Sequence, residues 1–104
     1  MSYACSYEVP ATIDMYREVR RLIGDEPATG MLAHLVVHSD SGLHHLEVWE
    51  SEAACQRFRE DRVVPAVHTV LKAPGFTEMP PEPILEELEL VDVQLGACAT
   101  SAAR

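Results

Sequence analysis

The sequence predicts one α+β domain of βαββαβ order whose sheet pairs with that of a second copy to close a barrel. Period-two alternation marks the strands, helical periodicity marks the segments between them, and one predicted sheet face mixes apolar with polar side chains. A chain of 104 residues fits one domain, and at this size only about two-thirds of the unfolded surface is buried. We therefore expect a single domain over residues 1–95, a flexible tail over residues 96–104, and self-association.

The first strand is predicted over residues 3–9, where larger side chains alternate with smaller or polar ones. A helix follows, because apolar residues recur on one helical stripe and charged residues on the other. Pro10 and Thr12 open this helix, and Gly24 provides its stop. Residues 25–30 are polar and contain Pro and Gly, which indicates a loop.

A β-hairpin is the next predicted unit, with strands over residues 31–38 and 43–50. Residues 39–42 read Ser-Asp-Ser-Gly, which is the chemistry of a tight turn. Directly opposed residues of such a hairpin share one face of the sheet. A turn centred on Asp40 and Ser41 sets Leu32 opposite Trp49, His34 opposite Glu47, Val36 opposite His45 and His38 opposite Leu43.

The second half of the chain is predicted to hold a helix, a loop and the fourth strand. Ser51 is the expected N-cap of the helix, and Pro65 predicts a kink or break near residues 62–64, because proline cannot donate to the preceding turn. Residues 74–83 carry four prolines and are expected to form an ordered loop. Residues 84–95 are rich in aliphatic side chains and are predicted as the last strand.

The two faces of the hairpin differ in composition. We expect the aliphatic face to pack beneath both helices; it carries Ala33, Leu35, Val37, Leu46 and Val48. The opposite face carries His34, His38, His45, Glu47 and Trp49 among apolar residues. That face is too apolar for open water and too polar for a dry core, which is typical of a ligand-lined cavity or a wet interface. Its cover is expected from a second copy.

Charge and cysteine content narrow the functional class. With 17 acidic and 8 basic residues the net charge is −9, so the surface repels nucleic acid and anionic membranes. Three cysteines without C-x-x-C spacing argue against a disulfide framework and a thiol-ligated zinc site. The amino terminus lacks a signal-peptide pattern. We expect a cytoplasmic protein, and the arginine bias indicates a GC-rich bacterial genome.

The pair His34 and Glu47 is the expected catalytic pair. A carboxylate beside an imidazole fixes its tautomer and raises its basicity, as a general base requires. The alternative is a buried pair that only satisfies two polar groups or sets the dimer register. His45, Trp49, His38 and Tyr7 are the expected ligand-binding residues, with a packing role as the alternative for Trp49.

A metal site is a further alternative, since His34 and His45 share a face with Glu47, and such a set can hold zinc or iron. The spacing matches no known metal signature. Gly-rich phosphate loops and nucleotide motifs do not occur in the sequence. We therefore expect no metal and no cofactor.

The run from His34 through Trp49-Glu50-Ser51 into the following helix, with Phe58 and Pro65, resembles the dimeric α/β-barrel superfamily, especially its antibiotic-biosynthesis-monooxygenase-like members. In those proteins a strand ending in Trp-Glu/Asp-Ser leads into a helix with an inward Phe. The likeness covers residues 3–95 in element order and about 30 residues in motif. It implies a ferredoxin-like βαββαβ antiparallel sheet with two helices on one face, and a homodimer.

Two functions follow from this resemblance and from the residues. The first is a homodimeric barrel that binds a small aromatic or polyketide-like metabolite; as an enzyme it would carry out cofactor-independent oxygenation or a cyclase-like proton transfer. The second is a non-catalytic stress or regulatory dimer. Neither involves nucleic acid or a membrane, and the sequence leaves the choice open.

Overall fold

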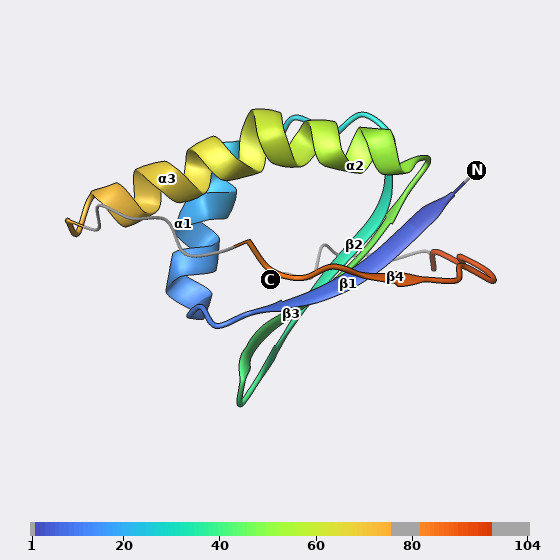
Figure 1. Ribbon diagram of the computed structural model, residues 1–104, viewed down its shortest axis with the longest axis horizontal. Coiled ribbons are helices and arrows are strands. Elements are labelled where there is room, and N and C mark those ends of the chain that lie inside the picture. The colour runs from blue at the N-terminus through green and yellow to red at the C-terminus, as the bar shows by residue number, and fades with distance from the viewer. Residues whose placement is uncertain (1, 76–81, 97–104) are drawn as a thin grey trace.

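The computed structural model describes residues 2–75 and 82–96, and the elements follow the predicted order. They are β1 (Tyr3–Val9), α1 (Ile13–Ile23), β2 (Met31–Ser39), β3 (Gly42–Trp49), α2 (Glu52–Phe58), the π-helical turn η1 (Arg59–Val63), α3 (Val64–Lys72) and β4 (Glu86–Leu88). The antiparallel sheet has the order β2-β3-β1-β4, and the helices lie on one side of it (Figure 1). This confirms the predicted α+β class.

The helix boundaries arise from local side-chain and backbone chemistry. Thr12 Oγ1 accepts a hydrogen bond from the Met15 N–H at 3.1 Å, and Ser51 Oγ accepts one from the Ala54 N–H at 3.1 Å. Both are N-cap bonds that satisfy donors otherwise left free at a helix start. Gly24 ends α1 at φ 88°, a conformation that favours glycine. None of the helices among the described residues is long and apolar enough to span a bilayer.

Pro65 changes the hydrogen bonding of the second helical region without interrupting its course. The sequence predicts a kink or a break near residues 62–64, and the structure has an irregular, π-helical turn there, η1, while the helix runs from α2 through it into α3 without a break (Figure 1). The Val64 N–H donates to the Arg59 carbonyl, five residues back, while Pro65 lies in the first turn of α3. The missing N–H of Pro65 is thus accommodated by one wider turn.

The predicted hairpin register is confirmed over most of its length. His34 pairs with Glu47, and Ser39 pairs with Gly42 across the turn. The end far from the turn differs, because a register shift between Met31 and Ala33 sets Met31, not Leu32, opposite Trp49. One extra residue on β2 is the mark of a β-bulge.

The predicted assignment of the two sheet faces is wrong. The side chains on the helix side of β3 are buried: Leu43, His45, Glu47 and Trp49. The aliphatic side is the open one, with Leu35 58% and Val37 51% exposed. The polar face is therefore covered by this chain's own helices, and the aliphatic face lies on the side away from them.

The reason for this inversion lies in β1. Tyr3, Cys5 and Tyr7 pair with Trp49, Glu47 and His45, so the largest side chains of both strands share one face. Burying these rings against the helices removes more surface from water than burying valines and leucines. The polar groups on that face are hydrogen-bonded to one another, which makes their burial possible.

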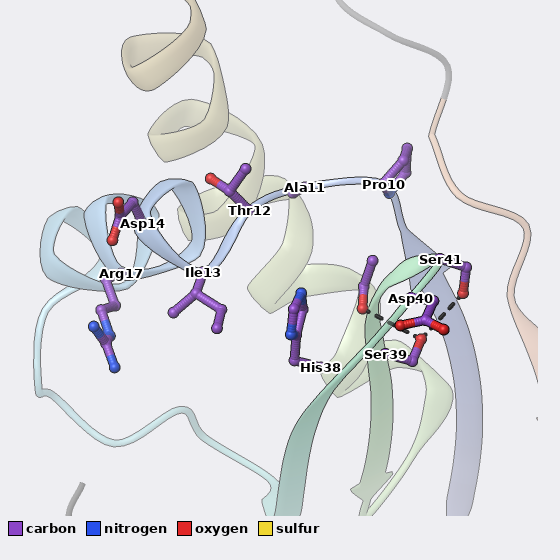
Figure 2. A pocket seen from close by; sticks show the side chains of 11 residues that line it. Pro10, Ala11, Thr12, Ile13, Asp14, Arg17, His38, Ser39, Asp40 and Ser41 are labelled. Carbon is purple, nitrogen blue, oxygen red and sulfur yellow. Dashed lines mark hydrogen bonds between the residues drawn. The ribbon is translucent and has the colours of Figure 1, made fainter.

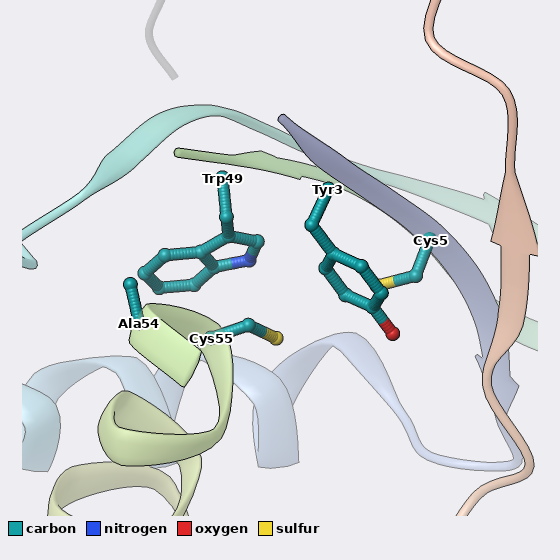
Figure 3. Packing of buried hydrophobic residues seen from close by; sticks show 5 residues of the cluster. All are labelled: Tyr3, Cys5, Trp49, Ala54 and Cys55. Atoms are coloured by element: carbon teal, nitrogen blue, oxygen red, sulfur yellow. The ribbon is translucent and has the colours of Figure 1, made fainter. Parts of the chain in front are cut away.

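The core packs where the start of β1 and the end of β3 meet α2. Its buried members are Tyr3, Cys5, Trp49, Ala54 and Cys55 (Figure 3). Phe58 lies against the Trp49 indole, with ring centroids 5.4 Å apart. Trp49 therefore packs between the sheet and α2, which is the packing role that the sequence offered as its alternative.

The last strand is shorter than predicted. β4 spans only Glu86–Leu88, and it pairs with the first half of β1, ending with Leu88 opposite Ala4. β1 begins at Tyr3, so residues 90–95 have no partner strand among the residues that the structure describes. Val91 and Leu95 are accordingly exposed. Most of the predicted loop over residues 74–83 and of the tail over residues 96–104 lies outside the described residues.

Candidate functional site

The carboxylate of Glu47 is the centre of a buried polar cluster. It accepts hydrogen bonds from the Tyr7 hydroxyl at 2.5 Å, from the Trp49 Nε1 at 2.9 Å and from the Cys55 thiol at 3.8 Å. The donors come from β1, β3 and α2, so the carboxylate sits where sheet and helix layers meet. A buried carboxylate needs such donors because it has lost its hydration. These bonds hold Glu47 in one position.

Two histidines extend the cluster toward the edge of the sheet. His34 Nε2 lies 3.1 Å from His45 Nδ1 and 3.6 Å from Glu47 Oε2. Burial lowers the pKa of both imidazoles, although Glu47 acts in the opposite direction, and the pKa of His45 falls to about 4. At neutral pH both rings are therefore uncharged, with one lone pair each. The His34 side chain is 23% exposed, which opens the cluster to solvent.

Aromatic rings pack around His45. The Tyr7 ring stacks on the His45 ring at 4.5 Å between centroids, and Tyr16 of α1 meets the same imidazole edge-on at 5.8 Å. Burial, with the nearby Glu47 charge as second cause, raises the pKa of Tyr7 far above its ordinary value, so this hydroxyl stays protonated. The Arg59 guanidinium lies over the Tyr7 ring at 5.6 Å. The result is a neutral imidazole pair in which His45 contacts the tyrosine rings and His34 lies near the fixed carboxylate.

The structure gathers five of the six residues proposed as site residues. His34, His45, Glu47, Trp49 and Tyr7 are linked through the contacts described above. His38 lies elsewhere: it lines an open hollow of about 670 Å³ between the start of α1 and the hairpin turn, beside Ile13 and Arg17 (Figure 2). Its register position is as predicted, but β2 carries it beyond the cluster.

Sequence reasoning missed Cys5, Cys55, Tyr16 and Arg59. A signal existed for two of them. Cys5 alternates with Tyr3 and Tyr7 on the first strand, and Cys55 lies on the inner stripe of the second helix. Pairing the first strand with the third would have set Cys5 beside Glu47. Tyr16 and Arg59 reach the cluster only through helix packing, which the pattern does not specify.

Two sets of side chains in the cluster could ligate a metal. His34, His45 and Glu47 form one, Cys5, Glu47 and Cys55 form the other, and within each set the ligand atoms lie within 4.8 Å of one another. Each set contains donors that divalent first-row metals accept. Glu47 belongs to both.

The arrangement agrees with the fold of known structures. A candidate antibiotic biosynthesis monooxygenase from Chloroflexus aurantiacus aligns at TM-score 0.57 and 16% identity over 90% of this chain and 97% of its own. A second one, from Caulobacter crescentus, aligns at 0.56 and 16%, over 88% and 91% of the two chains. A protein of unknown function from Nitrosomonas europaea aligns at 0.57 and 17%, over 92% and 93%.

No protein-family model and no curated protein sequence matches the chain. The structural likenesses confirm the resemblance at the level of fold: the chain has the ferredoxin-like α+β fold of antibiotic-biosynthesis-monooxygenase-like proteins. Activity does not follow from fold, because one fold hosts many functions.

Proposed function

We propose that the chain forms a homodimer through its exposed aliphatic sheet face and binds a small, planar, aromatic or polyketide-like metabolite at the edge of the Glu47 cluster. The observation that carries the binding proposal is His34, a neutral imidazole that is partly exposed and anchored on its inner side. The His45 ring stacks beside His34 at 5.3 Å between centroids, and the rings of Tyr7 and Tyr16 contact His45 in turn, which favours a planar partner.

The chemistry that these groups support is cofactor-independent oxygenation or a cyclase-like step that begins with removal of a proton. The polar partners of His34 lie on its Nε2 side, where Glu47 Oε2 is at 3.6 Å and His45 Nδ1 at 3.1 Å. In this proposal the imidazole proton of His34 lies on Nε2, toward these two groups, and the Nδ1 lone pair is the base. In this proposal Glu47 is a positioning residue and His34 takes the proton from a phenol or an activated methylene.

A non-catalytic dimer is the second candidate, and one observation favours it. Among the described residues, every buried side-chain nitrogen and oxygen has a hydrogen-bond partner. A fully satisfied network is what a purely structural cluster needs, because it leaves no group waiting for a ligand. A cytoplasmic location is part of either proposal, and the free thiols of Cys5 and Cys55 support it.

The replacement His34→Gln separates the two candidates. We expect planar phenols to raise the melting temperature of the wild type by several degrees, since a ligand at a hundred times its Kd adds about 2.7 kcal/mol. His34→Gln should lose this response because the base and its contact surface are gone. His38→Gln is the matched control, as it changes an exposed histidine of the same strand outside the cluster.

Differential scanning fluorimetry with a set of phenols and polycyclic quinols provides the measurement. A response lost in His34→Gln and kept in His38→Gln supports the site. If the wild type responds to none of the compounds, or if both variants respond as the wild type does, the non-catalytic dimer is the better description.

A further inference from the structure

His34, His45 and Glu47 present three ligand atoms to one point. Glu47 lies opposite His34 across the hairpin, and His45 lies two residues before Glu47 on the same face of β3. His34 Nε2 is 3.1 Å from His45 Nδ1 and 3.6 Å from Glu47 Oε2, and the three ligand atoms lie within 4.8 Å of one another. Because the backbone pairing of two strands sets this arrangement, it does not depend on a flexible loop.

These spacings suit a tetrahedral metal ion. Ligand atoms at about 2.0 to 2.1 Å from a zinc ion lie about 3.3 to 3.4 Å from one another. The separations from His34 Nε2 to the other two ligand atoms, 3.1 and 3.6 Å, fall on either side of this value. The third separation, between His45 and the Glu47 carboxylate, is longer and lies within 4.8 Å. An ion therefore fits between the three atoms when His45 and the carboxylate move about an ångström closer together.

The surroundings of the two candidate metal-binding sets favour His34, His45 and Glu47 over Cys5, Glu47 and Cys55. Cys5 and Cys55 are almost completely buried beneath the Trp49 and Tyr3 rings (Figure 3), so an ion has no path to them. His34 is partly exposed and provides an entry path. Glu47 is in turn held by the Trp49 and Tyr7 donors, the kind of outer support that ligating carboxylates have.

We propose that His34 Nε2, His45 Nδ1 and the Glu47 carboxylate bind one divalent first-row transition-metal ion per chain, of the Zn²⁺ class, with a fourth position open toward solvent. Two imidazoles and one carboxylate are the donor set that such ions take in proteins. This goes beyond the proposed proton transfer and excludes it while the ion is bound. The ion occupies Nε2 and moves the imidazole proton to Nδ1, which is then a donor and no longer a base.

Zn²⁺ alone is the probe for the first experiment. Protein stripped with EDTA and dialysed free of it is titrated with Zn²⁺ by isothermal titration calorimetry, with circular dichroism as the check on folding. We expect one Zn²⁺ per wild-type chain and at least about tenfold weaker binding in His34→Gln. His38→Gln and His44→Gln are matched controls from the same hairpin, and they should bind as the wild type does.

A second measurement needs no variant. Co²⁺ added to the stripped wild type should give the visible d–d bands of a four-coordinate nitrogen and oxygen site without a thiolate charge-transfer band. A thiolate band, stoichiometry below one, or equal weakening by His34→Gln and His38→Gln would overturn the proposal. Neither measurement uses an organic ligand, so a failed phenol response and a failed metal site are separate results.

Discussion

At the scale of single residues, Glu47 is the side chain on which the cluster depends. Glu47 is 5% exposed, yet its carboxylate accepts hydrogen bonds from donors on three elements, and His34 Nε2 lies 3.6 Å from its Oε2. Burying a charge is costly unless it is hydrogen-bonded. The donors Tyr7 and Trp49 therefore stabilise the fold as well as positioning the carboxylate.

The replacement Tyr7→Phe tests the strongest of these donors. It removes the hydroxyl that lies 2.5 Å from Glu47 and keeps the ring that stacks on His45. Leaving a buried acceptor without its donor costs about 1 to 3 kcal/mol of unfolding free energy, more where the acceptor is charged. We expect a loss of that size in urea unfolding followed by the fluorescence of Trp49, which is the one tryptophan of the chain.

Tyr16→Phe is the control for this measurement. Its hydroxyl makes no hydrogen bond to the described residues, while its ring contacts the same imidazole. A change within about 0.5 kcal/mol is expected. Equal losses in the two variants would show that the Tyr7 hydroxyl contributes nothing particular to the cluster.

The pair His34 and Glu47 could be predicted because hairpin register follows from turn chemistry alone. The layer that covers the pair could not be predicted by counting aliphatic residues. A face with Tyr, Trp and hydrogen-bonded His and Glu buries more surface than a Val and Leu face, and the count ignores both size and polar pairing. The alternation of tyrosines on the first strand, together with the pairing of this strand with the third, would have indicated which face the helices cover.

At the scale of elements, the close approach of the hairpin turn to the end of β1 depends on Gly42. Its φ is 128°, and a Cβ there would lie 2.4 Å from the Val9 carbonyl oxygen and 3.0 Å from the Pro10 Cα. Both neighbours are backbone atoms and cannot move aside as a side-chain tip would. This glycine therefore permits the turn of the hairpin to pack beside β1.

Gly42→Ala should destabilise the protein more than Gly24→Ala does. Gly24 also has positive φ, but nothing lies within 4 Å of a Cβ added there, so its replacement carries the backbone penalty of about 1 to 3 kcal/mol alone. Gly42→Ala adds a steric overlap, and we expect at least about 1 kcal/mol beyond the Gly24→Ala loss. Urea midpoints of the two variants provide the comparison, and equal midpoints would contradict the overlap.

Elements whose signals are local were the predictable ones. The N-caps at Thr12 and Ser51 and the stop at Gly24 lie where the sequence indicated. The extent of β4 depends on how far β1 reaches, and the π-helical turn depends on how a helix on the sheet accommodates Pro65. Both are decided by packing between distant segments, which a local pattern does not contain.

At the scale of the whole molecule, one face of the sheet is covered by helices and the other is aliphatic and open. Leu35 and Leu46 are directly opposed on the open face, and they are 58% and 37% exposed. An exposed apolar patch of this kind marks an interaction site. A second copy is the proposed cover, since the same face meets itself across a two-fold axis.

The replacement Leu35→Glu should convert the proposed dimer to a monomer, because the two-fold axis would bring two buried carboxylates into one interface. Leu22→Glu is the matched control: it places the same charge at a leucine that is 39% exposed on α1, on the helix side of the sheet. Sedimentation equilibrium at micromolar concentration should give a dimer for the wild type and for Leu22→Glu, and a monomer for Leu35→Glu.

The salt dependence of the dimer dissociation constant tests whether apolar burial or ion pairing holds this interface together. Each copy carries a net charge of −9, so two copies repel, and association must come from apolar burial. Raising the ionic strength screens the repulsion over a Debye length of about 8 to 10 Å near physiological salt and leaves apolar burial in place. The dimer dissociation constant should therefore fall as salt rises. A dissociation constant that rises with salt would mean that ion pairs, and not the face around Leu35, hold the copies together.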